Sequence, residues 1–132
     1  MRVFYLDTSA VMTFLQKEDR TAALGDWKDT LESADHIVSS DILRTELLLG
    51  ASRLNVPLLD VGALLSSMSL LTVTAGLCEA AGRLSGLSLR SLDALHIASA
   101  MSLTSSLNAL VSYDTRMLHA AKQLGIPTLA PT

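Results

Sequence analysis

The stretch Val3-Phe4-Tyr5-Leu6-Asp7-Thr8-Ser9 indicates how this chain folds. Its apolar and aromatic residues follow one another without alternation, which is typical of a strand buried on both faces at the centre of a parallel sheet. The run ends in a carboxylate, Asp7, and a Thr-Ser pair suited to capping a helix follows. An acid at the carboxyl end of such a strand lies in the crevice where open α/β sheets bind ligands. The alternative is that Asp7 only closes the strand as a turn residue.

Composition restricts the class of protein. We expect the 132 residues to form one domain, 1–132, long enough to bury roughly two thirds of its unfolded surface. A hydrophobic fraction of 49% with 17% charged residues excludes a disordered chain. A lone cysteine, Cys78, and the lack of any apolar run near the ~18 residues that span a membrane predict a cytoplasmic protein without a membrane segment. The net charge of −3 argues against a surface that attracts nucleic acid everywhere, but leaves room for a local basic rim or for metal ions.

Strand and helix patterns alternate along the chain, which predicts an α/β fold, a three-layer α/β/α sandwich with a mostly parallel central sheet. Strands are expected at 3–6, 36–38, 70–73, 109–113 and 126–129. Helices are expected at 9–15, 21–34, 41–54, 60–68, 75–84, 89–98 and 115–124. The expected N-caps are Ser39-Ser40, Asp60 and Thr74, and the expected C-cap is Gly125. Pro127 suits an edge for the last strand.

Glu46 has unusual surroundings on the expected helix 41–54. Its neighbours three and four residues away are all apolar or glycine: Ile42, Leu43, Leu49 and Gly50. A glutamate inside an apolar stripe is costly to bury unless it is paired or binds a metal. Because no basic partner stands on the same helix face, we predict a functional role for Glu46.

Two further carboxylates stand at expected element ends. Asp114 follows the strand 109–113, just as Asp7 follows the first strand. Asp93 lies in the first turn of the helix 89–98, where an acid also simply favours the helix dipole by ~0.3–1 kcal/mol, so both interpretations stay open. His96 lies one turn further on. We expect it to be a hydrogen-bonded core histidine, because no His or Cys with zinc spacing accompanies it.

Convergence of these four acids would require a cation, because like charges a few ångströms apart repel one another. An all-oxygen set without His or Cys suits Mg²⁺ or Mn²⁺. Acid clusters of this kind serve in-line displacement at phosphorus. Other acid-bearing α/β sites fit less well: residue 9 is Ser where an Asp-x-Asp phosphatase needs an acid, and residue 11 is Val where an adhesion site needs Ser. No late strand ends in the Lys of a phospho-receiver, and there is no Gly-rich phosphate loop.

Four motifs in order carry a family resemblance. They are Tyr-Leu-Asp7-Thr-Ser-Ala, Leu-Arg-Thr-Glu46-Leu, Leu-Arg-Ser-Leu-Asp93-Ala-Leu-His and Tyr-Asp114-Thr-Arg-Met, and the chain then reaches Leu-Gly-Ile-Pro. Together they resemble a PIN-domain ribonuclease and, within that family, the VapC-type toxins of prokaryotic toxin–antitoxin pairs. The resemblance covers essentially the whole chain. One departure is Thr115, where many relatives carry a basic residue.

The resemblance implies a Mg²⁺-dependent endoribonuclease whose acidic site comprises Asp7, Glu46, Asp93 and Asp114. It also implies a homodimer held inactive by a small antitoxin, with Ser9 and Ser112 as hydrogen-bond partners of the acids. The three aspartates would hold the metal directly or through water, and Glu46 would ligate a second ion or orient the attacking water. The products would be a 3′-hydroxyl and a 5′-phosphate.

The basic residues nearest the acids are Arg90 and Arg116. Each would meet the RNA backbone, neutralise an acid, or lie solvated on its helix. The alternative function is a PIN-fold module that binds RNA or a protein without cutting, against which the four intact acids argue.

Overall fold

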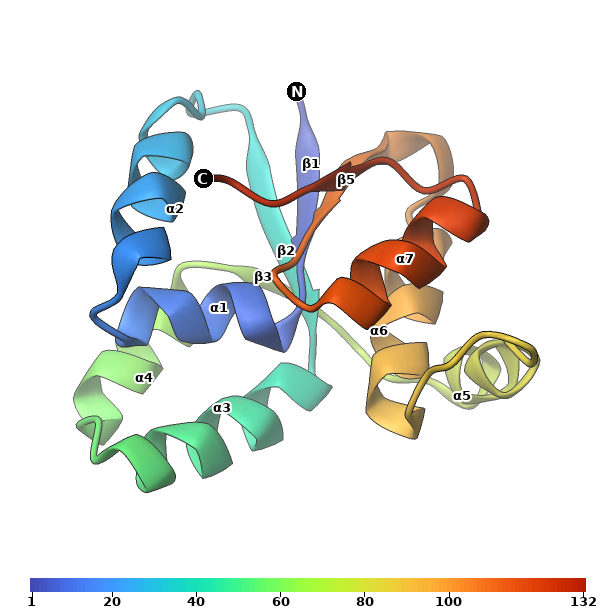
Figure 1. Ribbon diagram of the computed structural model, residues 1–132, viewed down its shortest axis with the longest axis horizontal. Helices are drawn as coiled ribbons and strands as arrows, with labels where there is room; N and C mark the ends of the chain where they lie inside the picture. The colour runs from blue at the N-terminus through green and yellow to red at the C-terminus, as the bar shows by residue number, and fades with distance from the viewer.

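Five strands form one sheet with helices on both faces in the structure, a computed structural model that describes residues 1–132 (Figure 1). The strands are β1 Val3–Leu6, β2 His36–Ser40, β3 Ser69–Leu71, β4 Leu107–Val111 and β5 Thr128–Leu129. The helices are α1 Thr8–Leu15, α2 Asp19–Asp29, α3 Ile42–Leu54, α4 Leu58–Ser66, α5 Ala75–Gly82, α6 Ser91–Ser102 and α7 Thr115–Gln123. The predicted three-layer α/β/α fold is confirmed.

The sheet has the order β3-β2-β1-β4-β5, and every pair of neighbouring strands is parallel. β1 therefore lies at the centre, and all four of its residues are buried, as its unbroken apolar run predicts. β5 lies at an edge, as Pro127 predicts.

Alternate residues of β1 enter two different cores. Phe4 and Leu6 pack with residues of α1 to α4, whereas Val3 and Tyr5 pack with residues of α6 and α7. Figure 1 shows the corresponding arrangement, with α1 to α4 on one side of the sheet and α5 to α7 on the other. The central strand thus joins both helix layers, which explains why four residues suffice to anchor it.

Several predicted boundaries and caps are wrong. The helix expected at 21–34 is α2, which ends at Asp29. Asp60 is not an N-cap, because α4 begins at Leu58, directly after Pro57. Ser39 and Ser40 belong to β2 rather than capping α3, and the Ser39 hydroxyl donates to the carbonyl of Leu6 at 2.7 Å.

Other helix ends agree with expectation. The Thr74 side chain accepts a hydrogen bond from the Leu77 amide and caps α5. After α7 the chain turns at Gly125, whose φ of +75° is the left-handed conformation that glycine adopts without strain. None of the seven helices combines the length and the apolar character that crossing a membrane demands.

The carboxyl ends of β1 and β4 lie side by side, and this pairing positions the site. Leu6 is paired with Val111, and the Asp7 amide donates to the Val111 carbonyl at 3.2 Å. α1 and α7 begin directly beyond these two strand ends. Residues that follow the two strands, 103 to 105 positions apart in sequence, therefore meet at one edge of the sheet.

Candidate functional site

Asp7 connects β1 to α1 and is almost completely buried, with 2% of its surface exposed. Its Oδ1 accepts hydrogen bonds from the Ser9 hydroxyl at 2.7 Å and from the Ala10 amide at 3.0 Å. Its Oδ2 accepts one from the Ser112 hydroxyl at 2.6 Å. Asp7 is therefore the N-cap of α1 as well as the link between the ends of β1 and β4. Ser9 and Ser112 are its hydrogen-bond partners, as the family resemblance implies.

Burial raises the pKa of the Asp7 carboxyl, although the hydrogen bonds from Ser112, Ser9 and the Ala10 amide act in the opposite direction. The two interpretations that the sequence left open are thus not exclusive. Asp7 holds its turn, and it does so as a buried acid whose charge is costly to maintain without a cation nearby.

The other three acids line one cavity of about 380 Å³. Glu46 reaches it from α3, Asp93 from the first turn of α6, and Asp114 from the start of α7. The remaining lining residues are Arg90, Ser91, Leu92, Thr115 and Arg116. Asp7 is not among them. The structure therefore separates the four predicted acids into one buried carboxylate and three that face an open, polar cavity.

Negative charge accumulates in this cavity. Partial burial raises the pKa of Asp93, and the charges of Asp114 and then Glu46 raise it further. Asp114 also caps α7, since its Oδ1 accepts hydrogen bonds from the amides of Arg116 at 2.9 Å and Met117 at 3.3 Å. The electrostatic coupling of the three acids means that a cation bound among them would relieve repulsion.

Glu46 has a partner that its own helix could not reveal. Its Oε1 accepts a hydrogen bond from the Thr8 hydroxyl at 2.7 Å and lies 2.9 Å from Nε2 of His96. Partial burial on its own raises the pKa of Glu46, but the bonds from His96 and Thr8 outweigh this effect and leave the pKa below its usual value.

His96 is a core histidine, as predicted, with 1% of its surface exposed. Its Nδ1 lies 2.7 Å from the hydroxyl of Tyr5 on β1. The involvement of Tyr5 and Thr8 was not predicted. In the sequence Tyr5 is simply one more residue of the apolar strand. No local pattern connects it with His96, which lies 91 positions away.

Two arginines border the acidic cavity. The side chains of Arg90 and Arg116 are exposed and line it, yet neither forms an ion pair within 4.0 Å. The arginines that do pair with carboxylates are Arg2, with Asp35, and Arg44, with Asp41. Arg90 and Arg116 are thus available to a negatively charged ligand.

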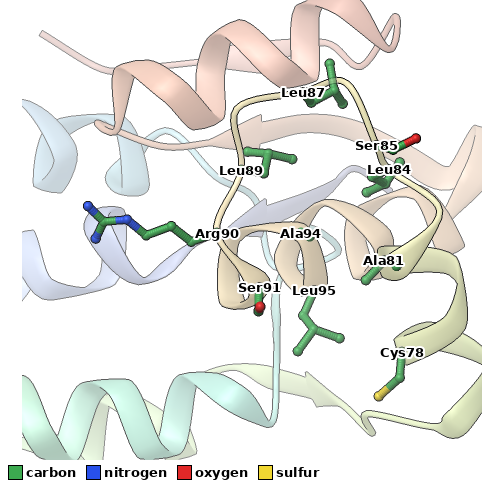
Figure 2. A pocket seen from close by; sticks show the side chains of 11 residues that line it. Cys78, Ala81, Leu84, Ser85, Leu87, Leu89, Arg90, Ser91, Ala94 and Leu95 are labelled. Carbon is green, nitrogen blue, oxygen red and sulfur yellow. The ribbon is translucent and has the colours of Figure 1, made fainter.

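A second cavity of about 400 Å³ lies between α5 and α6 and has a different character. Its lining is mainly apolar and includes Cys78, Ala81, Leu89 and Leu95 but none of the four acids. Figure 2 shows the side chain of Arg90 extending away from this apolar lining. The guanidinium thus points away from the apolar cavity, and Arg90 also lines the acidic one.

The donors of the acidic cavity suit a hard divalent cation. All of the candidate ligands are carboxylate oxygens, which Mg²⁺ and Mn²⁺ prefer. The nearest histidine, His96, turns its ring nitrogens to Tyr5 and Glu46. No three His, Cys, Asp or Glu side chains stand close enough together to form a ready-made metal site. The residues that line the cavity nevertheless fit such an ion by their chemistry.

Comparisons with known proteins agree with this geometry. The PIN domain family matches residues 4–123. The chain is 34% identical to Ribonuclease VapC46 of Mycobacterium tuberculosis over 140 residues, covering all of both chains. It is 32% identical to Ribonuclease VapC47 from the same species, covering 98% of this chain and 97% of the relative.

Two solved structures have the same fold. One is VapBC2 from Rickettsia felis bound to a DNA fragment from its promoter, with a TM-score of 0.74 at 18% identity, covering 98% of this chain and 99% of that one. The other is VapC20 of Mycobacterium tuberculosis, described as a sarcin-ricin loop cleaving toxin. Its TM-score is also 0.74, at 17% identity, covering 97% and 99%.

Proposed function

Because the chain belongs to the PIN-domain family and within it to the VapC ribonucleases, we propose that it is a metal-dependent endoribonuclease, the toxin of a toxin–antitoxin pair. The proposal assigns residues 1–132 to one nuclease domain acting in the cytoplasm. The observation that carries it is the single cavity that Glu46, Asp93 and Asp114 line together with two unpaired arginines. Carboxylates for a cation and arginines for phosphates are the complementary parts of a phosphodiester hydrolase.

The acids have different roles in this proposal. Asp93, Asp114 and Glu46 would hold Mg²⁺ or Mn²⁺. The buried Asp7 would add negative charge to the site and would also fix the ends of β1 and β4. When bound, the ion supplies activation of water and stabilisation of charge at the phosphate. Oε2 of Glu46, which accepts no hydrogen bond from the protein, is available to orient the attacking water.

Arg90 and Arg116 would bind the phosphates that flank the cleaved bond. Guanidinium groups bind phosphate oxygens through two parallel hydrogen bonds, and both side chains are exposed and unpaired. Since the whole chain carries a net charge of −3, attraction of RNA would be confined to this local basic border.

The proposal includes a cognate antitoxin and self-association into a homodimer. Solved relatives include VapBC-1 of nontypeable Haemophilus influenzae. The C-terminal half of α3 and the start of α4 expose large apolar side chains: Leu48, Leu49, Leu54, Leu58 and Leu59. Such surface is commonly covered by a protein partner. Expression of the toxin alone should slow growth, and co-expression of the antitoxin should restore it.

Cleavage of RNA by the purified protein, free of antitoxin, is the direct test. We expect endonucleolytic products with 3′-hydroxyl and 5′-phosphate ends in Mg²⁺ or Mn²⁺, and no products in chelator. The control is the double variant Asp93→Asn/Asp114→Asn, purified in the same way. Binding of RNA without cleavage in either metal would instead support a non-cutting binding module. Cleavage that persists undiminished in chelator would contradict the metal mechanism.

A further inference from the structure

A continuous hydrogen-bonded chain runs from the central strand to the acidic cavity. The Tyr5 hydroxyl lies 2.7 Å from Nδ1 of His96, and Nε2 of His96 lies 2.9 Å from Oε1 of Glu46. Thr8 Oγ1 also bonds Oε1 at 2.7 Å, and it lies 3.0 Å from Nε2 of His96. Tyr5 and His96 are buried, so water does not compete for these contacts.

The donors in this chain can be assigned from hydrogen-bond chemistry. An ionised carboxylate only accepts hydrogen bonds, so the ring nitrogen that faces Glu46, Nε2 of His96, must carry a hydrogen. In a neutral imidazole the other nitrogen is then an acceptor, and the Tyr5 hydroxyl must donate to Nδ1. Burial raises the pKa of Tyr5 to about 12, so the phenol keeps the proton that it donates.

We propose that Tyr5 and His96 are positioning residues for Glu46: Tyr5 holds the His96 ring through Nδ1, and Nε2–H of His96, together with Thr8, anchors Oε1 and leaves Oε2 for the acidic cavity. A free glutamate side chain samples many rotamers, and two hydrogen bonds to one oxygen restrict it before any ligand arrives. The inference rests on the proposed nuclease function, for which it assigns two residues that do not touch the reacting atoms.

The first test observes the tautomer in the apo protein and does not depend on activity. A long-range ¹H–¹⁵N correlation spectrum reports which ring nitrogen of each histidine carries a hydrogen. The His96→Gln variant identifies the signal among the three histidines of the chain. We expect His96 to carry its hydrogen on Nε2 alone in the wild type. A wild-type ring protonated on Nδ1 alone, or on both nitrogens, would overturn the assignment.

The second test separates positioning from stability. In Tyr5→Phe and His96→Leu we expect kcat to fall by roughly 10–100-fold with little change in KM for RNA. His96→Gln should recover part of kcat, because its amide also donates a hydrogen bond towards Glu46. The matched control is Ile97→Val, which removes one buried methylene from the next residue of α6 without touching Glu46. Its melting temperature should fall while its kcat stays at the wild-type value.

The outcomes distinguish this inference from the proposed function. If the wild type fails to cleave any RNA but has the Nε2–H tautomer, the nuclease proposal fails and the assigned hydrogen-bond chain stands. If the wild type cleaves RNA and Tyr5→Phe, His96→Leu and Ile97→Val all lose activity only in proportion to stability, the positioning role is wrong.

Discussion

The three aspartates of the candidate site occupy two regions with opposite physical character. The first region consists of Asp7 with Ser9 and Ser112, where both carboxylate oxygens accept hydrogen bonds from the protein and Asp7 has almost no exposed surface. The second region is the cavity wall, where Asp93 and Asp114 are half-buried, open to a ligand and electrostatically coupled. Acids that look alike in sequence, each at the start of a helix, thus divide between holding the fold and receiving a ligand.

Glu46 connects the two regions. One of its oxygens is fixed by Thr8 and His96, as the oxygens of Asp7 are fixed by serines, and the other accepts no bond from the protein. The difference between the regions indicates that the buried, hydrogen-bonded carboxylates preorganise the site, whereas the carboxylates that face the cavity are the ones able to bind a ligand. Charge-removing substitutions should therefore have different consequences in each region.

The largest effect on activity should follow from substitution of the aspartates that line the cavity. We expect Asp93→Asn/Asp114→Asn to lower kcat/KM for RNA by about 10²–10³-fold or more, because the variant loses two of the candidate metal ligands. Asparagine is as good an N-cap as aspartate, so the start of α7 should be preserved. Melting in chelator should show an apo protein at least as stable as the wild type. Loss of activity that only parallels loss of folded protein would contradict this assignment.

Asp7→Asn should act on both activity and stability. The raised pKa of Asp7 means that its charge opposes folding above the unfolded-state pKa, so removing the charge should stabilise the apo protein at pH 7, by ~1–2 kcal/mol. Activity and the Mg²⁺-dependent rise in melting temperature should both decrease, because the negative charge of the Asp7 carboxylate is lost.

The matched control is Asp35→Asn, far from the cavity. Arg2 donates hydrogen bonds to Asp35 and forms an ion pair with it, which lowers the pKa of the Asp35 carboxyl. This carboxylate therefore stabilises the fold at pH values above its unfolded-state pKa. Removing its charge should destabilise the protein at pH 7. The metal response should be unchanged. Two Asp→Asn changes with opposite signs would sharpen the comparison, whereas destabilisation by both would mean that Asp7 acts mainly through its hydrogen bonds.

The fold and the acids that line the cavity could be singled out from the sequence because their signals are local. The apolar run of β1 indicates burial on both faces, and an acid directly after a parallel strand lies at the ligand-binding edge. Glu46 attracted attention through its apolar helix neighbours. In each case the residues that carry the signal lie within about four positions of one another.

What could not be predicted depends on contacts between distant parts of the chain. Tyr5, Thr8 and His96 come from β1, α1 and α6, and only the packed fold reveals that Tyr5 bonds His96 and that Thr8 and His96 bond Glu46. The division of the acids into buried and open members has the same origin, because it depends on how deeply Asp7 lies between β1 and β4. Helix caps failed where a nearby proline or a longer strand set the boundary, as at Asp60 and Ser39.

The arginines should affect binding more than chemistry. We expect Arg90→Ala and Arg116→Ala each to raise KM for RNA by about tenfold, the typical value of one charge-assisted hydrogen bond, and to weaken the salt dependence of binding. Arg83→Ala is the control, since Arg83 is exposed but does not line the acidic cavity. Equal effects of all three substitutions would indicate non-specific attraction.

The smallest effect should be a pH dependence of apo stability. The pKa values of Asp7 and Asp93 are both raised on folding, so their favourable contribution is complete below the unfolded-state pKa and is lost as pH rises through the folded-state values. The stability difference between Asp7→Asn/Asp93→Asn and the wild type in chelator should therefore grow from pH 4 towards neutrality. Urea unfolding at several pH values measures it, and a constant difference would show that these charges do not oppose folding.

The location of the cation is the central claim, and titration with paramagnetic Mn²⁺ followed by amide NMR tests it most directly. Mn²⁺ broadens signals near its binding site. We predict that the first signals to disappear belong to residues around Glu46, Asp93 and Asp114, and that Mg²⁺ in excess restores them. In Asp93→Asn/Asp114→Asn the broadening should require much more Mn²⁺. Selective broadening at another surface, or none at millimolar Mn²⁺, would contradict the account.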